Sequence, residues 1–242
     1  MSCLLSIFIP LIIYGMPQYL DAAQSLPNSL AALQSLLLLA WLAQGICFPY
    51  LGSRAISTIQ DNGLLEWWIA AGIFPWRVAL GQSLAILTSW SLYLLLIISP
   101  LSIWLGKGER TIPYGLLIEH NILYLISGEV LLLLTFVLGT FSTQMISCLG
   151  GVAIWSLSLC GGDLVSGVIS HLPGYFRIII GWGWYSLPRF DFFYRPLSLV
   201  YLWPPLDLPV MASILGYGMS YGVLLLLCCE ILYHPRYSTS SS

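Results

Sequence analysis

The chain has 242 residues and a formal net charge of −2, and 58% of its residues are hydrophobic while only 7% are charged. A water-soluble domain needs about 25% charged residues to keep its surface wetted, so this composition excludes a soluble globular protein. The near-neutral charge balance also gives no basis for a nucleic-acid partner. The composition predicts an integral membrane protein whose surface faces the lipid bilayer.

Six apolar runs are candidates for membrane-spanning helices, which need about 20 consecutive apolar residues. None alternates every second residue as a barrel strand would, so the expected fold class is all-α. The first run is short and has no basic residue before it, which favours a short span over a cleaved signal sequence. The predicted spans of this single transmembrane domain, residues 1–242, are 3–16, 30–51, 78–105, 114–138, 144–159 and 210–233.

Between the second and third spans, residues 61–73 predict a short helix on the membrane surface. Asp61 is a good helix-starting residue, and Gly63 permits a tight turn after it. Glu66 falls in the first turn, where a negative charge suits the helix dipole, and Pro75 is expected to end the element. Helical spacing places the apolar residues on one face, namely Leu64, Leu65, Trp68, Ile69 and Gly72.

The segment before the last span, residues 160–209, is rich in glycine, proline and aromatic residues and carries mixed charges. Tryptophan and tyrosine at this density are typical of the headgroup level of a membrane. We therefore expect interfacial or re-entrant helices that lie against the bundle and cap its non-cytoplasmic side.

Glu129 lies near the middle of the fourth predicted span, where a charge costs about 2.5–3.5 kcal/mol on insertion scales. Two interpretations stay open: a place in a translocation path or proton relay, or a protonated glutamic acid that bonds a neighbouring helix. Near the C-terminus, Gly218 and Gly222 form a G-x-x-x-G pattern, which favours close helix packing.

No motif in the sequence predicts catalysis. The Glu119–His120 pair lacks the second histidine of a H-E-x-x-H zinc site, and no G-x-S-x-G or P-loop sequence occurs. Ligation of a haem by His120 or His171 is weighed against a role as an interfacial hydrogen-bonding group, which we favour. No metal or cofactor is therefore expected, and the chain is interpreted as a non-enzyme.

The order of elements in the first two thirds of the chain resembles the permease subunits of ABC type-2 transporters. In that family the loop after the second span reads acidic-x-Gly-Ser/Thr-Leu-Glu, and Gly63, Leu65 and Glu66 match it, while Leu64 replaces the hydroxyl residue. The run VALGQSLAILTSWSLYLLLIISPLSIWLG is similar to the family's third span. The resemblance covers roughly residues 30–160, and the haem-exporter B-type permeases share the same six-span plan.

The resemblance implies that residues 61–73 form a cytoplasmic coupling helix that binds a separate ABC ATPase subunit. It implies a multi-pass protein of the inner membrane that pairs with a second permease copy and exports its cargo at the expense of ATP. One alternative is a haem-exporter-like subunit of cytochrome c maturation, and another is an intramembrane enzyme or a scaffold. The residues expected to couple to the ATPase are Asp61, Gly63, Leu65, Glu66 and Trp67.

Overall fold

The computed structural model is all-helical in the residues that it describes, which are 28–106, 114–171, 173–193 and 206–237. These residues form seven α-helices and one 3₁₀ helix, and no strand occurs among them. The all-α fold class is therefore confirmed. The first predicted span, residues 3–16, lies outside the described residues.

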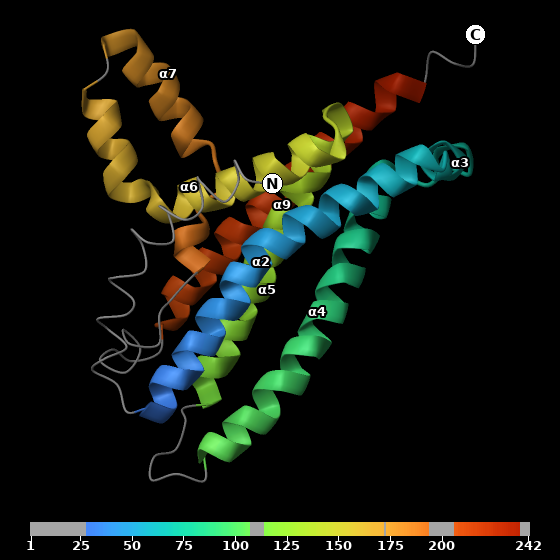
Figure 1. Cartoon of the computed structure of the whole chain (residues 1–242). Helices are drawn as coiled ribbons and strands as arrows, with labels where there is room; N and C mark the ends of the chain where they lie inside the picture. Colours follow the sequence, from blue (N-terminus) through green and yellow to red (C-terminus); the bar gives the residue numbers. More distant parts are fainter. Residues whose placement is uncertain (1–27, 107–113, 172, 194–205, 238–242) are drawn as a thin grey trace.

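The other five predicted spans each fall within a long helix (Figure 1). These helices are α2 (Asn28–Asp61), α4 (Pro75–Gly106), α5 (Tyr114–Phe141), α6 (Gln144–Ser170) and α9 (Leu208–Tyr237). Three shorter elements connect them: α3 (Leu64–Ala70), α7 (Gly174–Tyr185) and the 3₁₀ helix η1 (Phe190–Phe193).

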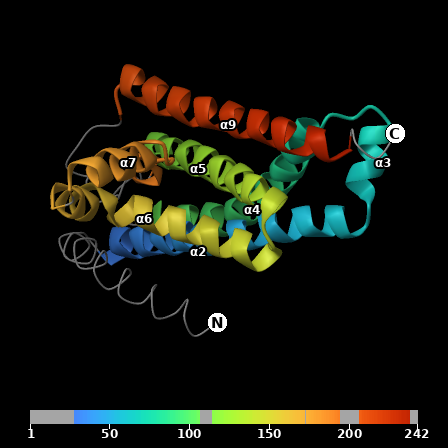
Figure 2. The ribbon, with the colours of Figure 1, turned by 90° about the horizontal axis from the view of Figure 1, so that it is seen from above.

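Helix α5 forms the centre of the bundle. It packs against α2, α4, α6 and α9, and Figure 2 shows it enclosed between α9 on one side and α2 on the other. Its middle section supplies much of the core, because the consecutive residues Val130–Leu133 are each 0–1% exposed. A helix that is apolar and buried all round in this way belongs to the interior of a helical assembly.

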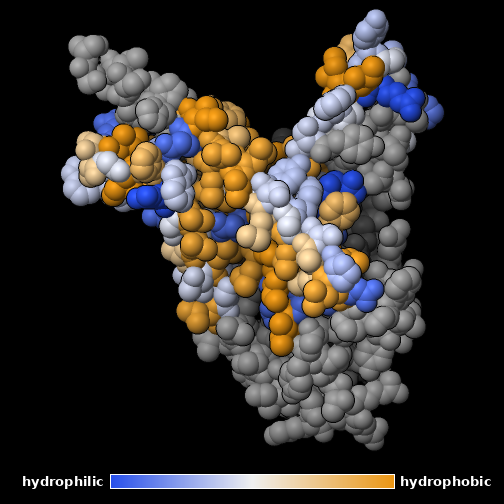
Figure 3. Space-filling view, turned by 180° about the vertical axis from the view of Figure 1, so that it is seen from behind, coloured by the Kyte–Doolittle hydropathy of each residue, from blue (hydrophilic) through white to orange (hydrophobic). Residues whose placement is uncertain are grey.

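Two helices in the described part of the chain have the length and composition of a membrane span, Ile118–Phe141 and Leu208–Leu232. Of the second, only 11% is buried inside the bundle, and its exposed apolar side chains include Met219, Val223, Leu224, Leu227 and Ile231. Figure 3 shows a broad hydrophobic area in the middle of the face seen there. A third apolar helix, Gln144–Ser158, is shorter.

Helix α2 is longer than the sequence predicts. The span was expected to end at residue 51, whereas the helix continues without a break to Asp61. Pro49 lies inside it, where its missing N–H and its ring are a usual cause of a bend, and the ribbon of α2 bends partway along its length (Figure 1). At about 1.5 Å per residue, such a helix is longer than the hydrocarbon core is thick.

Glycines allow α2, α5 and α6 to approach closely. A methyl group at Gly45 of α2 would overlap the ring of Trp155 of α6, and one at Gly128 of α5 would overlap Phe48 of α2. Small residues at such contacts are a known means of packing helices in membranes, where no hydrophobic effect drives them together.

The segment 160–209 differs from the expected interfacial region. Its first part continues α6 to Ser170, and α7 then forms a hairpin with the end of α6 that projects from the bundle (Figure 1). In contrast, η1 packs against α5 and α6, and both Phe190 and Phe193 are fully buried. The segment therefore inserts into the bundle as well as lying beside it.

Candidate functional site

The turn before α3 differs in detail from the sequence prediction. Asp61 was expected to start the surface helix, but it is the last residue of α2. Gly63 lies in the turn between α2 and α3. It has a left-handed conformation, with φ 64°, and its N–H donates to the Gln60 carbonyl at 3.1 Å. A residue with a side chain is strained at such a φ, so the expectation that glycine makes this turn is confirmed.

The other end of α3 also relies on a glycine. Pro75 was expected to end the element, but α3 ends at Ala70 and Gly72 reverses the chain with φ 78°. Pro75 is instead the first residue of α4, a position where its missing N–H costs no hydrogen bond. The short helix is thus set between two glycine turns and leads directly into α4.

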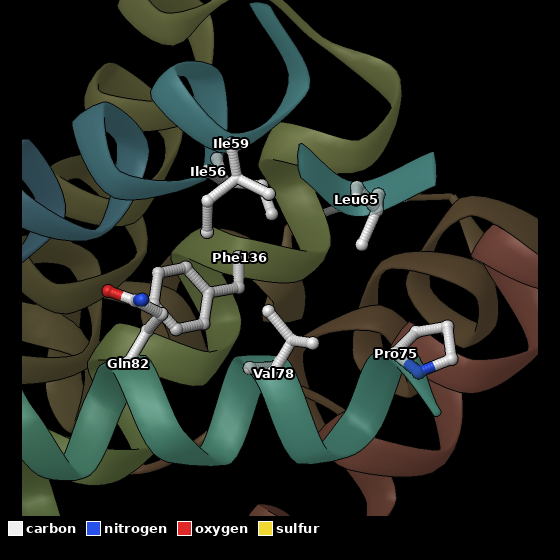
Figure 4. Close-up of a pocket in the computed structure, with 8 residues that line it drawn as sticks. Ile56, Ile59, Leu65, Pro75, Val78, Gln82 and Phe136 are labelled. Carbon is white, nitrogen blue, oxygen red and sulfur yellow. The ribbon is translucent and has the colours of Figure 1, made fainter. Parts of the chain in front are cut away.

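One leucine fixes α3 to the end of the bundle. Leu65 is 1% exposed and lies in a hollow formed by α2, α4 and α5 (Figure 4). Burial of such a side chain contributes about 1.5–3 kcal/mol to the attachment of this helix of seven residues. The residues that line the hollow with it are Ile56, Ile59, Pro75, Val78, Ala79, Gln82 and Phe136.

The opposite face of α3 is open. Glu66 is exposed in the first turn, as expected, and Trp67 beside it is 66% exposed. Leu64 was expected to lie on the buried face, but it is 39% exposed, because a helix of two turns has room for only a narrow buried stripe. The face presents a carboxylate next to an indole ring.

A glutamate that the sequence did not single out lies beside the start of α4. The Trp76 N–H donates to the Glu230 carboxylate of α9 at 3.4 Å. The first N–H groups of a helix have no partner within it, and a negative charge there is favourable by about 0.3–1 kcal/mol. The last turns of α9 are therefore joined to the point where the α3 segment becomes α4.

Glu129 lies in the middle of the bundle, as its position in the sequence predicts. Ser83 of α4, which is 0% exposed, lies 2.7 Å from the Glu129 Oε1 atom. The Glu129 Oε2 atom is buried and has no hydrogen-bond partner among the described residues. Glu129 therefore faces α4, and it does not lie on the outer surface of the bundle.

The remaining residues named from the sequence have separate positions. Glu119 accepts a hydrogen bond from the Leu206 N–H at 3.1 Å, His120 is 8% exposed, and His171 is exposed. Among the described residues, no group of three potential metal ligands occurs. Within this part of the chain, the structure does not bring the two histidines into a ligand set.

The two glycines of the G-x-x-x-G pattern are not equivalent. A methyl group at Gly218 would overlap Ile126 of α5 and crowd the Phe193 ring at 3.1 Å. A methyl group at Gly222 would meet only the Leu133 Cδ1 atom at 3.9 Å, an ordinary contact. Gly218 is the residue at which the pattern's prediction of close packing applies.

A hydroxyl-lined seat for η1 was not predicted. The Arg189 N–H donates to the Tyr217 hydroxyl at 2.8 Å, and the Phe190 N–H donates to the Ser158 hydroxyl at 2.5 Å. Arg189 also forms a two-point ion pair with Asp191, which cancels their charges locally. Irregular backbone is tolerated at membrane depth only where its polar groups are satisfied by protein in this way.

Comparison of the chain with protein-family models, with curated proteins and with solved structures finds no match.

Proposed function

We propose that this chain is the membrane-spanning permease subunit of an ATP-driven exporter, with α3 as the helix that couples it to a separate ATPase. The observation that carries the proposal is the two-sided character of α3. Leu65 is buried in the bundle, while Glu66 and Trp67 are open to a partner. This open face offers a soluble partner both a charge and an apolar ring to bind.

The position of α3 supports the same function. It joins α2 to α4 at the end of the bundle where α9 also terminates, since Glu230 lies beside Trp76. A force applied to α3 therefore reaches three long helices through short connections. In the proposed mechanism, closure of the ATPase pushes α3, and α4 tilts against α5.

The proposal includes six membrane spans, a multi-pass location in the inner membrane and a second permease copy as partner. In this proposal the five long helices of the described residues are spans two to six, and the predicted first span, residues 3–16, lies outside the described residues. ATP hydrolysis is assigned to the partner subunit, so this chain contributes the path and not the chemistry.

Replacement of Glu66 tests the proposal. We expect Glu66→Ala to lose the ATPase that co-purifies with the wild-type protein in mild detergent, or to retain it and lose export. Folding should change little, because a surface charge near a helix start is worth about 0.3–1 kcal/mol. The readouts are the amount of ATPase recovered per permease and the export rate in membrane vesicles.

Asp207→Ala is the matched control, because it removes an exposed carboxylate that lies just before the first residue of α9. It should leave both readouts unchanged. If α3 is only a surface anchor, Trp68→Ala will destabilise the protein while Glu66→Ala has no effect on either readout. That result would refute the coupling function.

A further inference from the structure

The two short distances at Ser83 indicate whether the Glu129 carboxyl group carries a proton. The Ser83 Oγ atom lies 2.7 Å from the Glu129 Oε1 atom and 3.0 Å from the Leu80 carbonyl oxygen. Both distances are those of hydrogen bonds. A serine hydroxyl has one hydrogen, so it makes a full two-centre hydrogen bond to only one of these two acceptors at a time.

Both contacts are hydrogen bonds at once only if the glutamate supplies the second hydrogen. A protonated carboxyl donates from Oε1 to the Ser83 oxygen, and the serine then donates to the Leu80 carbonyl. An ionised carboxylate takes the serine hydrogen instead and leaves the Leu80 contact without one. The protonated form therefore accounts for the two short distances with no hydrogen missing.

The charges around Glu129 agree with a neutral acid. None of the described cations forms an ion pair with it, and its hydrogen bonding among the described residues is confined to Ser83. The acidic and basic residues on the elements that pack against α5 are Arg54 and Asp61 of α2, Arg77 of α4, Asp163 of α6, Asp191 of η1 with its neighbour Arg189, and Glu230, His234 and Arg236 of α9.

Among those whose side chains the structure describes, Arg54 and Asp61 are exposed and the others have partners away from Glu129. Arg189 pairs with Asp191, Arg77 stacks on Phe74 and Trp76, and Glu230 lies beside the start of α4. The remaining titratable groups on the neighbouring helices are thiols and phenols, which are uncharged near pH 7. They include Cys47, Cys148, Tyr217 and Cys229.

We propose that Glu129 and Ser83 form a proton-binding site that latches α4 to α5. In the proton-bound state the acid donates to Ser83, and the neutral pair lies in the apolar bundle without a counter-ion. On deprotonation the carboxyl O–H bond breaks, its electron pair stays on the carboxylate, and the proton passes to a base in the solvent. Ser83 then turns its single hydrogen from Leu80 to the new charge.

The latch links proton binding to the position of α4. A buried carboxylate without a cation draws water or separates the helices, because an uncompensated charge is costly in an apolar interior. Since α4 begins at Pro75, directly after the α3 segment, proton loss loosens the helix next to the proposed coupling element. The inference itself needs no ATPase and goes beyond the proposed export function.

Infrared spectroscopy of the purified chain in lipid nanodiscs tests the site without any transport assay. At pH 7 the wild type should show the C=O stretching band of a protonated carboxyl group, and Glu129→Gln should lack it. Glu119→Gln is the matched control, because it alters another glutamate of α5, near the first turns of the helix. This variant should keep the band. Ser83→Ala should keep the band and move it to higher frequency, as expected for a lost hydrogen bond.

Thermal unfolding at several pH values gives a second readout. The wild type should lose stability relative to Glu129→Gln as the pH rises above about 4.3, because the unfolded glutamate then releases its proton while the folded site keeps it. A pH 7 spectrum that is unchanged in Glu129→Gln would overturn the proposal. Parallel stability curves for the two proteins between about pH 5 and about pH 7 would overturn it as well, because a folded state that keeps its proton at pH 7 must lose stability over that range. Neither result bears on whether Glu66 recruits an ATPase.

Discussion

At the scale of single residues, the absence of a side chain at Gly218 allows α9 to pack closely against α5. Gly218 of α9 lies against Ile126 of α5 and the Phe193 ring, and a side chain there has no space. In a membrane the attraction between helices comes largely from such close contact, since lipid tails are as apolar as leucine. The contact is more sensitive to added volume than the apolar surface around it.

Gly218→Ala should therefore destabilise the protein by about 1–3 kcal/mol, the usual cost of forcing extra volume into a packed core. Gly222→Ala adds the same group one turn later, where it meets Leu133 at an ordinary distance. It should be neutral or slightly stabilising, because alanine is favoured over glycine in a helix by about 0.5–1 kcal/mol. Denaturant unfolding in detergent micelles measures both, and equal losses would contradict the packing described for α9.

At the scale of elements, the seat of η1 depends on side chains from two distant helices. Ser158 of α6 and Tyr217 of α9 accept the backbone N–H groups of Phe190 and Arg189. A buried N–H without a partner costs about 1–3 kcal/mol, so these hydroxyls determine whether the segment can remain inside the bundle. Packing of Phe190 and Phe193 then adds the apolar contribution.

Ser158→Ala should release this segment. The Phe190 N–H would lose its acceptor, and the expected cost is about 1–3 kcal/mol. Ser156→Ala is the matched control, because the Ser156 hydroxyl only donates to the Val152 carbonyl of its own helix. Limited digestion with trypsin should cleave after Arg189 faster in Ser158→Ala than in the wild type. Cleavage of Ser158→Ala and Ser156→Ala at the same rate would show that the Ser158 hydrogen bond does not hold η1.

The elements that the sequence predicts well are those with a strong local cause. The apolar runs specify the long helices, and Gly63 specifies the turn before α3, because a left-handed residue there needs glycine. Glu129 was also expected to face protein, since an isolated charge cannot face lipid without cost. Each of these follows from a property of the segment itself.

The features that were missed depend on tertiary contacts. The seat of η1 needs Ser158 and Tyr217, which are 59 positions apart in the chain (217 minus 158). Serine and tyrosine are also common residue types in apolar helices, so neither position stands out in the sequence. The pairing of Glu230 with the Trp76 N–H similarly joins distant segments, and no spacing rule connects them. Helices α2 and α6 continue beyond the predicted spans, to Asp61 and Ser170, because loss of hydropathy does not by itself end a helix.

At the scale of the whole molecule, the long helices define two opposite ends of the bundle. α2 ends and α4 begins at α3, and Glu230 places the last turns of α9 at the same end. Asp207, just before α9, lies 23 positions earlier (230 minus 207), which is about 35 Å along a helix at 1.5 Å per residue. This distance exceeds the hydrocarbon thickness of about 30 Å, so α9 has the length to place Asp207 and α3 on opposite sides of a bilayer.

Single cysteines at the two ends should therefore differ in accessibility. Asp61→Cys, at the end of α2, and Asp207→Cys both replace exposed side chains, so neither should disturb the core. In a background without the native cysteines, an impermeant thiol reagent added to intact cells should label Asp207→Cys at once. It should label Asp61→Cys only after the membrane is opened, because α3 faces the cytoplasm if it binds an ATPase. The reverse pattern would invert the orientation and exclude a cytoplasmic coupling helix. Labelling of both positions in intact cells would show that the bundle does not separate its two ends by a bilayer.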